Sequence, residues 1–545
     1  MLSRAADFDS LSAGFAWTLP QRYNIARSVC DDWAAREPDR LAIRHVSANG
    51  SHHDWSYAAL AAASNRFANA LSALGIKPGD RVALLLPQAP ETAIVHLAVY
   101  KLGAIAVPLA ALFGSDALRY RLTDSGARAL VTNAAGLAKV APLRADLPQL
   151  AEVVSIDGPG EGALGFADLM QKASDRFTCR DTGLNDPALM IYTSGTTGQP
   201  KGVLHGHRVL LGHLPGIELS QEFLGQPGDL LWTPADWAWA GGLLNALFPS
   251  LHQGVPVIAF SAQKFDPEQA FHLIASQGVR NVFVPPTALK MMRAVEHPAR
   301  RFDLKLRSIG SAGEALGREA FEWTRAELGL PVNEFYGQTE CNAVLGSCAG
   351  LGVSRAGAIG RAIPGHEVAI IGPDGIVLPR GTQGQIAVRR PDPVMFLEYW
   401  NKPDATAEKF IGDWMTTGDQ GVMDDDGYVE FIGRDDDVIT SASYRIGPGE
   451  IEDCLLTHPA VKLAAAIGKP DKLRTEIVKA YVVLADGFTA SDALAQEIRA
   501  HVRTRLSAHE YPREIDFLAE LPMTTTGKII RRELRDRAKA EGQAT

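Results

Sequence analysis

The chain contains few cysteines, and none of them is placed to bind a metal. Its five cysteines are scattered along 545 residues, without a Cys-x-x-Cys pair or a Cys/His ligand spacing. Their number is odd, and free thiols in a reducing compartment are the default for such a pattern. The sequence therefore predicts a cytoplasmic protein.

Long apolar runs are also missing. No segment reaches the roughly 18 apolar residues that a membrane span requires, and the richest, residues 93–109, is interrupted by Lys101 and Pro108 among others. That pattern favours a buried helix followed by a strand. Residues 1–10 lack the apolar region of a secretory signal. We therefore expect no membrane span.

Clusters of positive charge are absent as well. The net charge is -9, and no long basic run with interleaved aromatic residues occurs, which opposes broad nucleic-acid binding. An apolar content of 46% and a charged content of 21% suit a globular protein and argue against disorder. An anionic ligand must therefore be attracted by local groups.

The length requires more than one domain, because a single core does not usually grow this large. An apolar run, a helical segment and a second apolar run follow one another at 81–86, 90–102 and 104–109, and again at 256–260, 267–277 and 281–284. This is the pattern of βαβ units. We expect an α/β fold whose large N-terminal domain has parallel or mixed sheets covered by helices.

A small α+β domain is expected after residue 435. Seven aspartates fall within residues 419–437, where the composition changes, and 424–427 reads as an acidic hairpin. Beyond this segment, strand patterns occur at 461–467, 477–484 and 514–517, and a helical pattern at 491–506. We place the boundary at Asp436, which gives domains 1–435 and 436–545.

A run of hydroxyls, glycines and one lysine, Tyr-Thr-Ser-Gly-Thr-Thr-Gly-Gln-Pro-Lys-Gly, occupies residues 192–202. Glycines let the backbone approach an anion closely, and hydroxyls and an ammonium donate to its oxygens. It is not a Walker A loop, because Lys201 follows a proline and precedes Gly202. A flexible linker is the alternative, which the apolar run 188–191 just before it disfavours. The predicted phosphate-holding residues are Thr193, Ser194, Gly195, Thr196, Thr197, Gly198 and Lys201.

With this loop, the sequence resembles the acyl-adenylate-forming superfamily of acyl-coenzyme A synthetases, firefly-type luciferases and peptide-synthetase adenylation domains. The likeness covers nearly the whole chain. Further matching strings follow in the family's order at 311–314, 336–340, 416–419, 433–437 and 522–528. The segment 234–242 most resembles medium-chain acyl-coenzyme A synthetases. The resemblance implies an ATP-dependent carboxylate:coenzyme A ligase that forms acyl-CoA, AMP and pyrophosphate through an acyl-adenylate.

The resemblance also implies a nucleotide site. Thr339 would bond the α-phosphate, Glu340 would hold Mg²⁺, and Asp419 would accept the ribose hydroxyls with Arg434 beside it. The phosphate loop would hold the β- and γ-phosphates. The remaining implied nucleotide contacts are Gly313, Glu314, Ala315, Tyr336, Gly337 and Gln338. In isolation, Glu340 or Asp419 would read as a solvated surface acid, but the surrounding motifs favour the functional interpretation.

Lys528, in a Thr-Thr-Thr-Gly-Lys string, matches the family's lysine that reaches from a mobile small domain to the carboxylate and the α-phosphate. Its alternative is an exposed lysine in a charge run. Rotation about a hinge matching Asp436 would then admit coenzyme A beside Ser443, Tyr444 and Arg445. Ser443 departs from the glycine of many relatives, and its side chain is expected to narrow that channel.

The acyl pocket is expected to accept an acid larger than acetate. In the acetate-activating branch a tryptophan stands at the position of Gly337, and its loss would open space for several methylenes, each worth about 0.8 kcal/mol when buried. The other expected walls are Trp237, Trp239 and Gly241, although paired aromatics are more often plain core. Straight medium-chain, branched short-chain and aryl acids all remain open.

Three other functions share parts of this pattern. An enzyme that adenylates an acid and transfers it to a carrier-protein thiol is one, although no carrier domain is fused to the chain. Luciferase-type oxidation uses the same adenylation motifs. A non-catalytic adenylate-binding regulator is disfavoured by the presence of Lys528, Glu340 and Asp436. The expected ligands are a small-molecule carboxylate, ATP, coenzyme A and Mg²⁺, and a homodimer follows from base rates alone.

Overall fold

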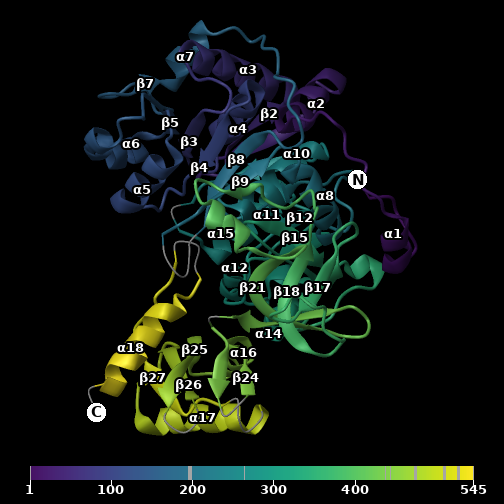
Figure 1. Cartoon of the computed structure of the whole chain (residues 1–545), viewed down its shortest axis with the longest axis vertical. Coiled ribbons are helices and arrows are strands. Elements are labelled where there is room, and N and C mark those ends of the chain that lie inside the picture. Colours follow the sequence, from purple (N-terminus) through teal and green to yellow (C-terminus); the bar gives the residue numbers. More distant parts are fainter. Residues whose placement is uncertain are drawn as a thin grey trace.

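Two large sheets and the helices around them form the upper part of the molecule, and a smaller unit lies below (Figure 1). The computed structural model describes residues 2–193, 199–262, 264–435, 437–441, 444–471, 475–506, 511–524 and 528–543. Side chains from α3 (Tyr57–Ala73), α4 (Pro90–Leu102) and α8 (Val209–Ser220) share one buried cluster with strand residues of both large sheets. These helices therefore fill the space between the sheets, and the α/β fold is as expected.

The first large sheet has eight strands and is mainly parallel. Its order is β19 (Glu398–Tyr399), β9 (Gly202–Gly206), β8 (Pro187–Tyr192), β4 (Ile105–Pro108), β3 (Arg81–Leu85), β5 (Ala129–Thr132), β6 (Glu152–Ser155) and β7 (Leu164–Gly165). Only β9 runs antiparallel to both neighbours. The strands β3 and β4, which precede and follow α4 in the sequence, pair in parallel. This confirms the first predicted βαβ unit.

The second large sheet has nine strands, in the order β16 (Arg361–Ala362), β15 (Cys341–Gly346), β14 (Val332–Gln338), β13 (Ser308–Ser311), β12 (Asn281–Phe283), β10 (Leu231–Trp232), β11 (Val257–Ala259), β1 (Leu41–Val46) and β2 (His52–Ser56). The predicted strands and helix 256–284 are present as β11, α11 (Pro267–Gln277) and β12. However, β10 lies between β11 and β12. A two-residue strand carries too little pattern to be recognised in a sequence.

A third sheet completes the large domain. It contains β17 (Val368–Ile371), β18 (Gln383–Arg389), β21 (Trp414–Met423), β20 (Phe410–Ile411) and β22 (Val429–Arg434). The acidic turn between β21 and β22 is the predicted hairpin, in which the Gly427 N–H donates to the Asp424 carbonyl at 3.1 Å. This hairpin places Asp419 directly opposite Arg434.

The smaller unit is the predicted α+β domain. Its sheet contains β24 (Tyr444–Ile446), β23 (Ile439–Ser441), β26 (Thr475–Leu484), β25 (Val461–Asp471) and β27 (Glu514–Phe517). Its helices are α16 (Pro448–Leu456), α17 (Asp492–Arg505) and α18 (Arg531–Gln543). The Ser491 side chain caps α17 by accepting the Leu494 N–H. Asp436, the predicted boundary, lies outside the described residues.

The remaining α-helices are α1 (Phe8–Gly14), α2 (Asp32–Arg36), α5 (Ser115–Ser125), α6 (Ala134–Val140), α7 (Phe166–Lys172), α9 (Ala240–Gly242), α10 (Phe248–His252), α12 (Pro286–Met292), α13 (Pro298–Arg301), α14 (Arg318–Trp323) and α15 (Pro403–Ala407). Across the described ranges, none of the helices combines the length and the apolar character that crossing a bilayer requires.

Candidate active site

The predicted phosphate loop joins two antiparallel strands, β8 and β9. Its two ends are tied together, because the Thr193 N–H donates to the Lys201 carbonyl at 3.0 Å and the Lys201 N–H donates to Thr193 Oγ1 at 3.4 Å. From α5, the Tyr120 hydroxyl donates to the Pro200 carbonyl at 2.8 Å. The central loop residues lie outside the described ranges: Ser194, Gly195, Thr196, Thr197 and Gly198. The base of the loop is thus fixed to the first sheet and to α5.

Glu340 lies close to this base. With Thr339 it forms the turn between β14 and β15, and its side chain is buried. Its Oε1 accepts a 2.5 Å hydrogen bond from the Tyr399 hydroxyl. The Lys201 ammonium lies 4.8 Å from the centre of the Tyr399 ring, a cation–π geometry. Tyr399 therefore joins the phosphate loop to the predicted metal ligand.

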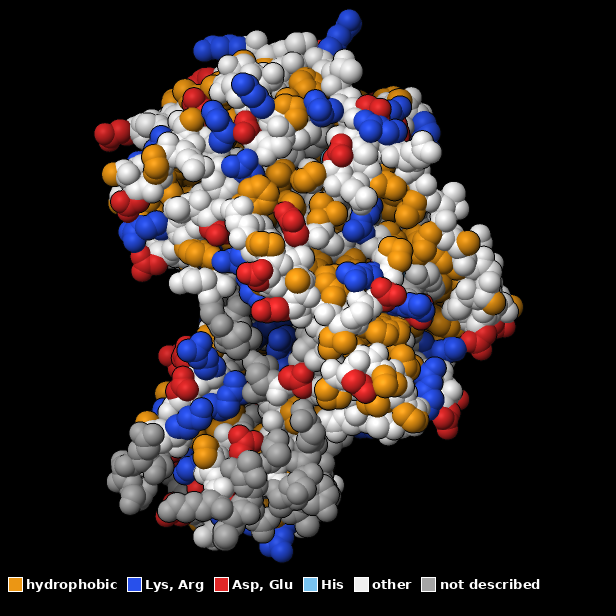
Figure 2. All heavy atoms as spheres, in the orientation of Figure 1, with side chains coloured by type: hydrophobic (Ala, Val, Ile, Leu, Met, Phe, Trp, Pro, Cys, Tyr) orange, Lys and Arg blue, Asp and Glu red, His pale blue; other side chains and the backbone are white. Residues whose placement is uncertain are grey.

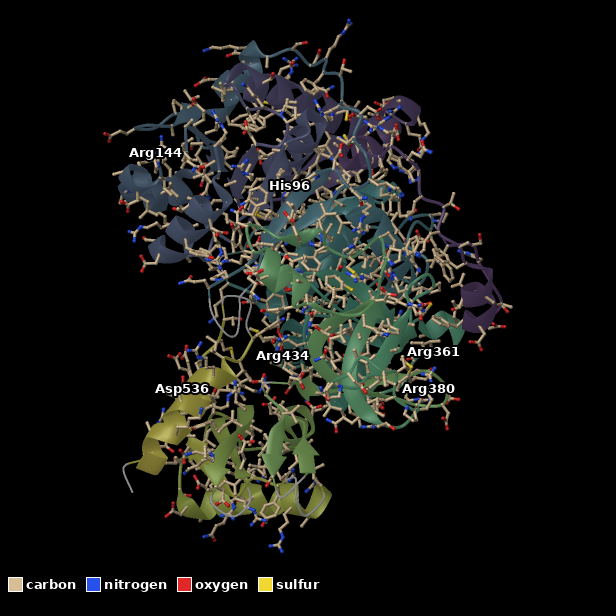
Figure 3. The ribbon with its side chains drawn as sticks, viewed as in Figure 1. His96, Arg144, Arg361, Arg380, Arg434 and Asp536 are labelled. Atoms are coloured by element: carbon tan, nitrogen blue, oxygen red, sulfur yellow. The ribbon has the colours of Figure 1, made fainter. Side chains whose placement is uncertain are left out.

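Asp419 is buried at the centre of a polar network. Its Oδ2 accepts hydrogen bonds from the Tyr336 hydroxyl at 2.5 Å and from Gln338 Nε2 at 2.7 Å, and Arg434 lies 3.5 Å from Oδ1. Burial raises the pKa of Asp419, while Arg434 and the two hydrogen bonds oppose that rise. Arg434 lies where the large and small domains meet (Figure 3). Four of the predicted nucleotide residues are thus brought together.

A second cation, Lys409, lies near the carboxylates of Glu340 and Asp419. Lys409 Nζ donates to Gln338 Oε1 at 3.4 Å. Burial lowers the pKa of Lys409, and the nearby carboxylates of Glu340 and Asp419 act in the opposite direction. The Lys409 carbonyl accepts hydrogen bonds from the Thr416 N–H at 2.8 Å and from the Thr416 hydroxyl at 3.0 Å. These two hydrogen bonds fix the backbone of Lys409 to the strand that carries Thr416.

Lys409 and Tyr399 are absent from the sequence-based site. No local sequence pattern marks Tyr399, because its role depends on a contact with Glu340, which lies 59 positions earlier in the chain. Lys409 had one weak signal, the Gly412-Asp413 turn between two short apolar segments, which predicts a hairpin. In that hairpin Phe410 pairs with Met415, so the residue before it lies beside the strand that carries Asp419.

The predicted adenine-contacting segment, residues 313–315, follows β13. Gly313 has a φ of +107°, a backbone conformation that favours glycine. The carboxylate of Glu314 accepts hydrogen bonds from the Thr287 hydroxyl at 2.9 and 3.1 Å. The side chain of Glu314 is therefore directed by α12, which carries Thr287.

Lys528 of the small domain lies near Glu314 and Asp419 of the large domain. Its side chain keeps contact with water, yet the protein atoms around its ammonium lower its pKa, while both carboxylates oppose that shift. Following Lys528, α18 is tied to the interdomain segment by Arg535, which donates to Asp437 at 2.5 Å. Figure 2 shows a recess between the domains on this face, with lysine and arginine side chains gathered over α18.

The predicted acyl-pocket aromatics lie in different surroundings. Trp237 is fully buried, and its indole N–H has no hydrogen-bond partner in the part of the chain that the structure describes. Trp239 is half-buried and meets Phe113 edge to face, with ring centres 5.6 Å apart. A Cβ added at Gly241 would lie 3.2 Å from the Phe283 ring. The absence of a side chain at Gly241 therefore allows its backbone to lie close to the buried Phe283 ring.

Gly337 requires a correction. A Cβ built there would lie 2.4 Å from the Asn342 Cα and 2.5 Å from the Ala343 nitrogen. The expected open volume beside Gly337 is therefore wrong, because the backbone of β15 fills the space. Glycine is needed at this position for the close approach of β14 and β15, and only its backbone could border an acyl group.

The predicted hinge and coenzyme A residues are only partly described. Asp436 and Ser443 lie outside the described residues, and Tyr444 and Arg445 are placed as backbone of β24.

No group of three or more His, Cys, Asp or Glu side chains within the described ranges could hold a metal ion. Mg²⁺ in nucleotide sites is usually bound by one or two carboxylates together with phosphates, so the buried carboxylate of Glu340 fits that ion.

Two family models and a human relative match the chain over most of its length. The AMP-binding enzyme family matches residues 30–400, and the AMP-binding enzyme C-terminal domain matches residues 450–528. The human protein "Acyl-coenzyme A synthetase ACSM4, mitochondrial" is 34% identical over 97% of this chain and 93% of its own length. Both matched regions contain predicted site residues, with Lys528 at the end of the second.

Solved structures resemble the chain over almost its entire length. A Brucella canis acyl-CoA synthetase is 36% identical, with a TM-score of 0.76, and the match covers 99% of this chain and 100% of that one. The anthranilate CoA ligase AuaEII, solved with anthranoyl-AMP, is 28% identical with a TM-score of 0.88, over 96% and 99% of the two chains. The match thus extends over both domains.

Proposed function

The chain belongs to the AMP-binding enzyme family and is an acyl-coenzyme A synthetase that couples ATP to acid:thiol ligation, and we propose that its acid is larger than acetate. The observation that carries the mechanism is that Lys528 of the small domain lies near enough to Glu314 and Asp419 of the large domain for their charges to act on its ammonium. A lysine from one domain thus reaches the nucleotide residues of the other. This proximity supports a site that is assembled when the domains close.

The chemistry explains why both cations and carboxylates are needed. A carboxylate does not acylate a thiol directly, because oxide would have to leave. Attack of its oxygen on the α-phosphorus of ATP expels pyrophosphate and gives an acyl-adenylate, whose AMP group can leave. That attack brings two anions together, so preorganised donors and cations must stabilise the transition state.

We assign the described residues to these tasks. Lys201 and Thr193, at the base of the phosphate loop, approach the β- and γ-phosphates, Thr339 donates to the α-phosphate, and Asp419 accepts the ribose hydroxyls. When Mg²⁺ is bound, Glu340 holds it, and the ion neutralises charge on the phosphate oxygens. The short hydrogen bond from Tyr399 orients the Glu340 carboxylate for that task.

Lys528 is proposed to serve the first half-reaction only. Its ammonium stabilises the charge that develops as the acid attacks phosphorus, and the small domain then rotates about Asp436 to admit coenzyme A beside Ser443, Tyr444 and Arg445. The last strand of the large domain, β22, ends at Arg434, and the first strand of the small domain begins at Ile439. A boundary at Asp436, between domains 1–435 and 436–545, is consistent with those limits.

The acid is proposed to lie beside Trp237, Trp239 and Gly241. Support comes from the Trp239 ring, which is only half-buried, and from the absence of a side chain at Gly241, where an added Cβ would lie 3.2 Å from the Phe283 ring. An aromatic wall suits an aryl or a medium-chain acid, because each buried methylene contributes about 0.8 kcal/mol. Gly337 contributes no open volume to this preference.

Acid-dependent exchange of labelled pyrophosphate into ATP tests the proposal without coenzyme A. Acetate, butyrate, hexanoate, octanoate and benzoate are compared by kcat/KM with the intact chain. We expect hexanoate or benzoate to exceed acetate by at least about a hundredfold, the value of roughly 2.7 kcal/mol of additional burial. A preference for acetate would contradict the acid assignment but not the adenylation chemistry.

Location and assembly are separate proposals. All five cysteines are free, which supports a reducing compartment such as the cytoplasm, whereas the human relative is named as mitochondrial. Cell fractionation of the tagged chain would decide between the two compartments. A homodimer rests on base rates, and light scattering of the purified chain would test it.

A further inference from the structure

Lys409 is a cation of the nucleotide site to which the family motifs give no role. It precedes β20, and the β20–β21 hairpin fixes its backbone through the two hydrogen bonds from Thr416, at 2.8 and 3.0 Å. Both strands belong to the third sheet of the large domain. The base of this side chain therefore stays with the large domain when the small domain moves.

The side chain of Lys409 lies near the metal carboxylate and the ribose carboxylate, Glu340 and Asp419, whose charges act on its ammonium. Its Nζ reaches Gln338, which is two residues before Glu340 in the chain and which donates to Asp419 at 2.7 Å. The 3.4 Å separation from Gln338 Oε1 is long for a hydrogen bond to an ammonium, and a lysine ammonium has three donors. Gln338 therefore holds Lys409 weakly and leaves it able to bind an anion.

We propose that Lys409 binds the α-phosphate of ATP and continues to bind the same phosphate in the acyl-adenylate. The inference rests on the proposed function, in which Asp419 holds the ribose and Glu340 holds the metal on the phosphates. The phosphate nearest the ribose must then lie between those two carboxylates. The ammonium of Lys409 lies close to that position, because it contacts Gln338, which donates to Asp419 and stands two residues before Glu340.

The position of Lys409 gives it a different role from that of Lys528. In the first half-reaction the acid oxygen bonds to the α-phosphorus as the bond to pyrophosphate breaks, and both lysines face the phosphate. In the second, the coenzyme A sulfur bonds to the acyl carbon, loses its proton to solvent, and AMP leaves with the electron pair. Lys528 has then withdrawn with the small domain, so Lys409 stabilises the departing AMP.

The test compares Lys409→Ala with Lys528→Ala in the two half-reactions, measured separately by pyrophosphate exchange and by coenzyme A acylation from supplied acyl-adenylate. We expect Lys409→Ala to lower both rates by about a hundredfold, and Lys528→Ala to lower only the first. Lys409→Arg should restore part of both rates. Acylation at the wild-type rate by Lys409→Ala would overturn the proposal.

A binding measurement separates phosphate contact from a structural role. By calorimetry, Lys409→Ala should bind AMP about tenfold more weakly than the wild type and adenosine equally well. The matched control is Lys402→Ala, at the start of α15, which should bind both as the wild type does. An equal loss of AMP and adenosine affinity would mean that Lys409 supports only the fold of the site. Failure of the wild type to adenylate any acid would instead overturn the proposed function.

Discussion

Replacing Lys528 with alanine should abolish most adenylation and spare thioester formation. The lysine comes from the small domain, and its ammonium lies near Glu314 and Asp419 of the large domain. Because the side chain is the only part removed, the loss is that of one preorganised cation at the phosphorus. Such a loss costs about 2.7–4 kcal/mol, or roughly a hundredfold to a thousandfold in rate.

The assay measures each half-reaction in isolation, with pyrophosphate exchange for the first and acyl transfer from synthetic acyl-adenylate for the second. Arg532 on α18 offers a matched control, because its side chain is mostly exposed and pairs within its own helix with Asp536. Arg532→Ala should leave both rates near the wild-type values. Equal damage by Lys528→Ala to both half-reactions would refute the assigned role, since it would show a general effect on the site.

Three further changes probe other parts of the large domain. Tyr399→Phe removes the 2.5 Å hydrogen bond to Glu340 and should raise the Mg²⁺ concentration needed for half-maximal adenylation by about tenfold. An unchanged Mg²⁺ titration would show that Tyr399 does not contribute to metal binding. Gly337→Ala should destabilise the large domain by about 1–3 kcal/mol, because its Cβ would meet Asn342 at 2.4 Å, and an unaltered melting temperature would show that β15 can shift. Burial raises the pKa of Glu334 to about 8, so its proton is bound more tightly in the folded chain and stability should fall as pH rises from about 4.5 to about 8. Glu334→Gln should therefore reduce the loss of melting temperature between pH 6 and pH 8, and an identical pH profile would contradict the shift.

Local sequence patterns were sufficient to predict the elements whose structure depends on residues close by in the chain. The apolar run that ends before Pro87, the helix from Pro90 and the next strand form the predicted unit, with Gly103 in the left-handed conformation at the end of the helix. The hydroxyl and glycine run between β8 and β9 likewise stands where an antiparallel turn brings its ends together. Each of these features is contained within fewer than about 30 consecutive residues.

Long-range packing explains what the sequence did not reveal. The space available to a side chain at Gly337 depends on how closely β15 passes, and a motif match cannot report that distance. Lys409 and Tyr399 enter the site through contacts with residues 71 and 59 positions away. Strand β10 enters between two strands that the pattern placed together, because sheet order is set by tertiary packing.

The central claim is that the chain forms acyl-coenzyme A through an acyl-adenylate. The most direct measurement is the product balance of the purified protein with ATP, Mg²⁺, coenzyme A and hexanoate or benzoate. We predict one AMP, one pyrophosphate and one acyl-coenzyme A for each acid consumed, with acyl-adenylate accumulating when coenzyme A is withheld. Formation of ADP and phosphate, or of acyl-coenzyme A without AMP, would contradict the account.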